Sequence, residues 1–213
     1  MISNFPNEKG KITLFIKNDV STSSCGRIDE NGKYFIIVKE EKEIRRMEYS
    51  FLHELVHCLQ MENGIIGIKE TKKEYNSLAV IINSIILDID VTNKLNQVGI
   101  FFDDCWIKED TQDLLDKIKE VSRNDAKFVA EYFKFEVYFL IIAKLLFCEL
   151  FYNTELLNES LKYCKNQNIE LFEMYRYVNG IIKNRDLNNQ RDVHTIFRYI
   201  LKKFSLYEYV LLP

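Results

Sequence analysis

Three residues in one short stretch, His53, Glu54 and His57, have the types and the spacing of a metal-dependent hydrolase site. They form a His-Glu-x-x-His pattern inside the segment from Glu43 to Gly64. If this segment is a helix, both histidines face the same side and can bind one zinc ion (Zn2+) through ring nitrogens at about 2.0–2.1 Å. Glu54 is then placed to accept a proton from a water that the metal activates. The stretch therefore predicts two zinc ligands and a general base on one helix.

The rest of the same segment predicts how this helix is held. Apolar residues recur at helical spacing on the side opposite the histidines, so we expect that side to pack on the rest of the protein. The apolar residues are Ile44, Phe51, Leu52, Leu55 and Leu59. The competing interpretation is an ordinary amphipathic helix whose histidines bind no metal.

A third metal ligand must come from another part of the chain. The segment 69–89 is apolar on nearly every face and predicts a buried helix. Asp88, near its end, is the first candidate, because a carboxylate on a buried helix is costly unless it is paired or bound to a metal. Glu74 falls on the same predicted stripe and is the alternative third ligand. Asp90 is a further candidate.

Composition narrows the classes of protein to which the chain can belong. With 213 residues, 47% hydrophobic and 29% charged, we expect a globular domain with one substantial core. The formal net charge is -3 and no basic stripe is present, so we expect no nucleic-acid partner. The longest apolar run, 137–151, is shorter than the roughly 20 residues that cross a bilayer. We therefore expect no membrane contact.

The cysteines and the N-terminus favour a cytoplasmic location. Five cysteines form no CxxC pair, and an odd number does not suit a disulfide framework. The first residues lack the basic and then apolar pattern of a signal peptide. Cys25 or Cys58 could in principle occupy the open position of a zinc site, although a small buried side chain is the simpler interpretation.

Short strands precede the histidine-bearing helix. The runs 11–17 and 34–38 are rich in strand-forming residues, and Asn31-Gly32 predicts a tight turn that pairs 26–29 with 33–38 as a hairpin. We expect a sheet of about three strands whose last strand leads into the helix. An exposed edge strand beside a zinc site could hold an extended peptide by main-chain pairing, although a plain capping hairpin fits the sequence equally well.

Helices dominate the remainder of the chain. Only seven glycines and two prolines interrupt it. Periodicity and capping residues predict helices at 111–122, 125–152, 154–165, 168–184 and 192–204. The aromatic residues crowded into 132–152 are expected to form core. The division that we predict is 1–100 and 101–213.

These features together resemble one protein family. A hairpin, the pattern R-x-x-x-x-x-x-HExxH from Arg46 to His57, and a buried helix that carries an acid are similar to the ImmA/IrrE metallopeptidase domains. The stretch from Asp88 to Gly99, of the form D-x-x-V-x-x-x-L-x-x-x-G, also resembles a feature of phage and mobile-element relatives. The resemblance covers about residues 11–100.

The resemblance implies a fold and an activity. The expected fold class is α+β and mostly helical. The resemblance implies a small N-terminal β-sheet packed on a zincin-like HExxH helix pair, and the periodicity after residue 110 predicts the all-helical C-terminal part that follows. The implied activity is hydrolysis of a peptide bond in a protein substrate, for which a repressor-type regulator is a candidate. His53 and His57 would bind zinc and Glu54 would be the general base.

Two matters stay open at this point. Better-known members carry a Glu followed by an Ala-Asn segment on the second helix, whereas this chain has Glu74-Tyr75-Asn76-Ser77-Leu78-Ala79. That departure leaves the third ligand undecided between Asp88 and Glu74. The alternative function is a non-catalytic regulatory or partner-binding module that retains the zincin fold. The sequence predicts no oligomeric state.

Overall fold

The computed structural model describes residues 12–28, 33–101, 113–124, 130–150 and 154–212. The chain forms two compact units. The sheet unit comprises Met1–Gly64 and Lys94–Ile100, and the helical unit comprises Ile65–Asn93 and Phe101–Pro213. Residues 65–93 thus group with the C-terminal helices.

The sheet unit contains a three-stranded sheet in the order β1-β3-β2. Strand β3 (Tyr34–Lys39) runs parallel to β1 (Ile12–Lys17) and antiparallel to β2 (Ser24–Arg27). The predicted hairpin is confirmed as the β2–β3 pair, and its Asn31-Gly32 turn lies outside the described residues. The strand that leads into the helix is central, because β1 pairs with the other side of β3. The edges of the sheet are therefore β1 and β2.

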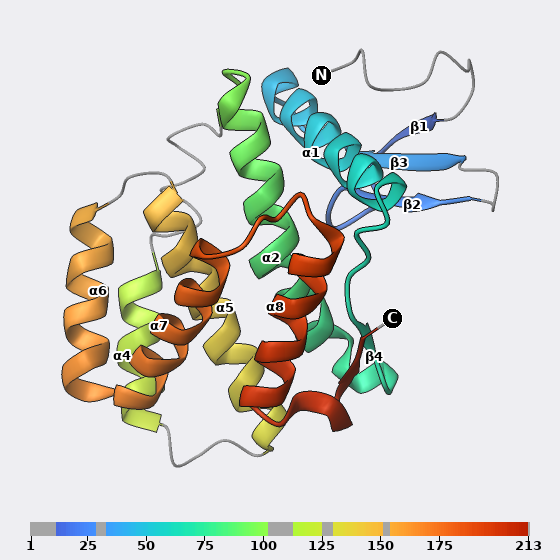
Figure 1. Ribbon diagram of the computed structural model, residues 1–213. Helices are drawn as coiled ribbons and strands as arrows, with labels where there is room; N and C mark the ends of the chain where they lie inside the picture. The colour runs from blue at the N-terminus through green and yellow to red at the C-terminus, as the bar shows by residue number, and fades with distance from the viewer. Residues whose placement is uncertain (1–11, 29–32, 102–112, 125–129, 151–153, 213) are drawn as a thin grey trace. The chain divides into compact units, whose positions relative to one another are not determined.

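Helix α1 (Ile44–Glu62) packs on one face of this sheet (Figure 1). Burial alternates along β3, so that Tyr34, Ile36 and Val38 face the helix. Phe51 and Leu55 of α1 pack against them, as predicted. Ile44 does not, since it is the first residue of the helix and is 67% exposed. Every second side chain of β3 thus packs against the apolar side of α1.

Helix α1 ends at Glu62, next to the Asn63-Gly64 pair that predicted its end. The N–H of Asn63 is bonded to the carbonyl oxygen of Leu59, and Gly64 has a φ of 74°. Glycine adopts this left-handed conformation without a Cβ clash, which is why Asn63-Gly64 terminates the helix.

The helical unit contains six of the seven α-helices of the described residues, and one of them, α2, ends in the sheet unit. Its elements in chain order are β4 (Lys69–Glu70), the 3-10 turn η2 (Lys73–Tyr75), α2 (Asn76–Gln97), α4 (Leu114–Asn124), α5 (Glu131–Leu150), α6 (Thr154–Gln167), α7 (Ile169–Lys183), α8 (Gln190–Lys203), η4 (Leu206–Glu208) and β5 (Val210–Leu211). The five helices predicted after residue 110 are confirmed as α4 to α8, although the predicted starts at 111 and 125 and the predicted end at 152 lie outside the described residues.

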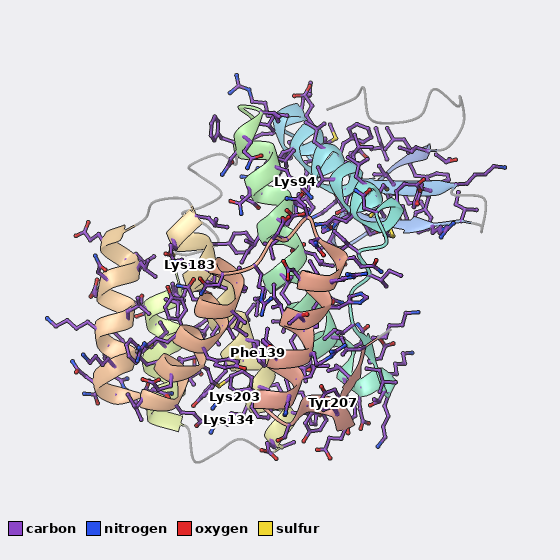
Figure 2. All side chains as sticks on the ribbon, viewed as in Figure 1. Lys94, Lys134, Phe139, Lys183, Lys203 and Tyr207 are labelled. Atoms are coloured by element: carbon purple, nitrogen blue, oxygen red, sulfur yellow. The ribbon has the colours of Figure 1, made fainter. Side chains whose placement is uncertain are left out.

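Helix α5 forms the centre of the helical unit's core. It packs against α4, α6 and α7, and nine of its 20 residues are buried. Phe139 is fully buried and lies amid the helices of this unit (Figure 2), with its ring against that of Phe204 at a centroid distance of 5.6 Å. Tyr138, also fully buried, accepts a hydrogen bond of 3.1 Å from the side chain of Asn168. Tyr138 and Phe139 confirm the expected aromatic core in part, whereas Phe133 of the same helix is 48% exposed, and Phe151 and Tyr152 lie outside the described residues.

Asn168 starts α7. Its Oδ1 atom accepts a hydrogen bond of 3.0 Å from the backbone N–H of Leu171, and its own side chain is 5% exposed. A side-chain acceptor at this position satisfies an N–H that the helix itself leaves without a partner. One buried amide thus caps α7 and fixes it to α5.

A second, two-stranded sheet joins distant parts of the helical unit. Strand β4 pairs antiparallel with β5, and the hydroxyl of Thr71 donates to the backbone oxygen of Glu208 at 2.7 Å. The prediction of a helix from residue 69 was wrong, because residues 69–75 form this strand and η2. Helix α2 begins at Asn76 instead and runs eight residues further than predicted, to Gln97. Among the described residues, no helix combines the length and the apolar character that crossing a bilayer requires.

Candidate metal centre

His53 and His57 meet at their ring nitrogens on one side of α1. The Nε2 atoms are 3.1 Å apart, and the ring centroids are 4.7 Å apart with the planes inclined by 75°. Two ligands at 2.0–2.1 Å from a tetrahedral zinc ion lie about 3.3 Å from each other. The spacing of the two nitrogens therefore fits a shared tetrahedral ion.

Gln60 fixes the orientation of His57. Its Oε1 atom lies 2.7 Å from His57 Nδ1, and its side chain is 2% exposed. An amide oxygen only accepts, so Nδ1 carries the ring hydrogen and Nε2 keeps its lone pair. This is the tautomer that binds a metal through Nε2, and such partners of ligating histidines hold the ring in place.

Gln60 was not predicted from the sequence, although a signal was present. It lies three residues after His57, and residues three apart on a helix are neighbours on its surface. Tyr49, four residues before His53, extends the same side of α1, and its ring centroid is 6.2 Å from that of His53. The side of α1 that carries the histidines is thus lined by residues that hold their rings.

Glu54 lies on α1 near the edge strand β2. Its side chain is 8% exposed and borders Cys25 of β2. The pKa of the Cys25 thiol is raised well above its usual range, first by its hydrogen bond with Cys58, then by burial and by the negative charge of Glu54. The hydrogen bond with Cys25 lowers the pKa of Cys58. The candidate general base is therefore at the β2 edge of the sheet unit.

The candidate acids occupy different environments. Asp88 lies on α2 within the helical unit and is half-buried, and Asp90 on the same helix is 4% exposed. Glu74 is exposed and lies in η2, before α2 begins. The expectation that Glu74 shares a helical stripe with Asp88 was wrong, because the helix starts two residues after Glu74.

Two histidines and one carboxylate form a donor set that suits zinc. Imidazole nitrogen and carboxylate oxygen are both common zinc ligands, and a combination of two histidines and one acid leaves a fourth position open for water. Calcium and magnesium prefer oxygen ligands alone. Comparisons of the chain with protein-family models, with curated proteins and with solved structures give no match.

Proposed function

We propose that the chain is a zinc-dependent metallopeptidase that hydrolyses a peptide bond in a protein substrate. The observation that carries the proposal is the meeting of His53 and His57 at a distance of 3.1 Å between Nε2 atoms. The hydrogen bond between Gln60 and His57 Nδ1 adds support, because it leaves the metal-binding lone pair on Nε2.

Asp88 is the third ligand in this proposal. His53, His57 and Asp88 are a combination that could hold a metal ion with one ligand atom from each residue. Asp88 is favoured over Glu74, which lies outside α2 and is exposed.

Glu54 is the general base in this proposal. A zinc ion supplies a Lewis acid that polarises a carbonyl group and lowers the pKa of water. The carboxylate of Glu54 takes the proton from the attacking water and delivers it to the nitrogen of the leaving amine. Burial of Glu54 limits competition from bulk water for this proton.

The neighbouring edge strand suits an extended substrate. Strand β2 is at an edge of its sheet, and Cys25 of β2 borders Glu54. An extended peptide that adds to such an edge is held by main-chain hydrogen bonds. A repressor-type regulator is a candidate substrate through the resemblance to the ImmA/IrrE domains.

Metal content and hydrolysis test the proposal together. We expect about one zinc per folded chain, measured by inductively coupled plasma mass spectrometry, and loss of bound zinc in His57→Ala. Glu54→Gln is expected to keep zinc and to lose cleavage of a peptide library followed by mass spectrometry. Glu48→Gln, at an exposed position of the same helix, is the matched control. A folded protein that binds no zinc would refute the proposal.

One outcome would favour the alternative function. In this outcome the protein binds zinc but cleaves no peptide in the library. If wild type and Glu54→Gln also capture the same protein partner, then the chain is a partner-binding module. Retention of capture in both forms would separate binding from catalysis.

A further inference from the structure

Two cysteines of the sheet unit face each other across the sheet–helix interface. Cys25 of β2 is opposite Ile36 of β3 in the ladder, and side chains opposite each other on neighbouring strands project to the same face. Ile36 is fully buried in the cluster that also contains Cys58 of α1. Cys25 therefore projects toward α1, and it packs against this cluster.

The two thiols are in contact. The Cys25 thiol forms a hydrogen bond with Cys58, and both thiols lie near the carboxylate of Glu54. Cys58 is 1% exposed, whereas Cys25 is only partly buried. Cys25 is thus the more accessible of the two residues, and Cys58 is the buried partner.

We propose that Cys25 and Cys58 are a redox-active dithiol that closes into a disulfide between β2 and α1. The oxidant is a small-molecule disulfide such as oxidised glutathione. Cys25 sulfur attacks one sulfur of that disulfide, and the first glutathione leaves as a thiol. Cys58 sulfur then attacks Cys25 sulfur, and the second glutathione leaves as a thiol. Two protein thiols are oxidised, one disulfide is reduced, and the two protons pass to the two glutathione thiols.

The other described cysteines lack this arrangement. Cys148 and Cys164 are fully buried in the helical unit, whereas Cys25 is only partly buried. Cys105 lies outside the described residues. A small-molecule disulfide cannot reach a fully buried thiol in the folded protein, so among the described cysteines oxidation is expected to begin at Cys25.

The bridge would act on the edge strand beside Glu54. Oxidation removes the Cys25 hydrogen and ties β2 covalently to α1 at the residue that follows His57. The neighbourhood of Glu54 therefore changes with the redox state. This inference does not depend on zinc binding or on hydrolysis.

Oxidation of the folded, full-length protein tests the inference. The protein is incubated with oxidised glutathione, alkylated and analysed by intact mass and peptide mapping. We expect a loss of about 2 Da before alkylation and a cross-linked pair of peptides that contain Cys25 and Cys58. Cys164→Ser should behave as wild type, whereas Cys25→Ser should form no bridge.

Several results would overturn the inference. One is a folded protein that stops at a mixed disulfide between Cys25 and glutathione. A second is a protein that stays fully reduced although Cys25 is alkylated rapidly. A third is a disulfide that involves Cys148 or Cys164. Since Cys58 is buried and Cys58→Ser could impair folding, the conclusion depends on wild type and Cys25→Ser, with circular dichroism as the check of folding.

Discussion

Replacement of Gln60 by leucine tests whether the amide prepares His57 to bind a metal. The hydrogen bond from His57 Nδ1 to Gln60 Oε1 is 2.7 Å long, and Gln60 is 2% exposed, so water cannot readily replace the lost acceptor. A buried N–H without an acceptor costs about 1–3 kcal/mol. His57 avoids that cost by moving its hydrogen to Nε2, and in that tautomer Nε2 can no longer bind zinc.

We expect Gln60→Leu to weaken zinc binding by about 10- to 100-fold, as is typical when the partner of a ligating histidine is lost. At about 1.4 kcal/mol for each tenfold change, this loss lies within the cost of the unpaired N–H. The assay is competition for zinc with a chelating dye at one fixed pH, with folding checked by circular dichroism.

Two variants make the result specific. Gln60→Glu keeps an acceptor for Nδ1 and should retain tight zinc binding. Gln97→Leu makes the same substitution at an exposed position in the last turn of α2 and should have no effect on affinity. If folded Gln60→Leu binds zinc as tightly as wild type, the hydrogen bond does not prepare the site and the reasoning is refuted.

Three further predictions concern the third ligand, α7 and the sheet unit. Asp88→Asn is expected to lose zinc by mass spectrometry, because an amide oxygen is a much weaker zinc ligand than a carboxylate, whereas Glu74→Gln should keep it. Asn168→Ala should lower the free energy of unfolding in urea by about 2–4 kcal/mol, because α7 loses its cap and Tyr138 loses a buried donor. Burial and a hydrogen bond to a carboxylate raise the pKa of Tyr34 to about 12, so wild type should lose stability from pH 10 to 12, and Tyr34→Phe should lose less.

Each of these predictions has its own contrary result and control. Loss of zinc from Glu74→Gln but not from Asp88→Asn would reverse the assignment of the ligand. For α7, Asn188→Ala at an exposed position should change stability little, and an equal effect of both substitutions would contradict the role of Asn168 as a cap. For Tyr34, the stabilising contribution of the raised pKa is complete below pH 10. A difference in urea midpoint between the two proteins that stays the same from pH 9 to pH 11 would therefore exclude it.

Local patterns in the sequence predicted the elements but not all of their partners. The spacing of His53 and His57 on a helix and the alternation along β3 are local features, and the structure contains both. Strand β4 has two residues and pairs with a strand far along the chain, so no periodic signal marks it. For this reason the start of α2 was placed too early and Glu74 was assigned to a helix.

The parts of the candidate site beyond α1 were harder to predict for a different reason. Acids are frequent on helices, and sequence spacing alone cannot tell which carboxylate faces an imidazole. Gln60 was not predicted because a single amide three residues after a histidine is common in helices. Only the 2.7 Å contact between its Oε1 atom and His57 Nδ1 assigns it to the site. The contact of Cys25 with Cys58 likewise depends on the register of β2 against β3.

The pairing of β4 with β5 constrains the order in which the helical unit can form during translation. Thr71 and Tyr209, which are hydrogen-bonded, are 138 positions apart. At about 5–20 residues per second, a ribosome takes roughly 7 to 28 s to synthesise the chain between them. During that interval, the segment that leads into α2 has emerged while the strand that pairs with it has not yet been made. A nascent chain stalled before Val210 should therefore expose residues 69–75 to protease, and release of the stall should protect them.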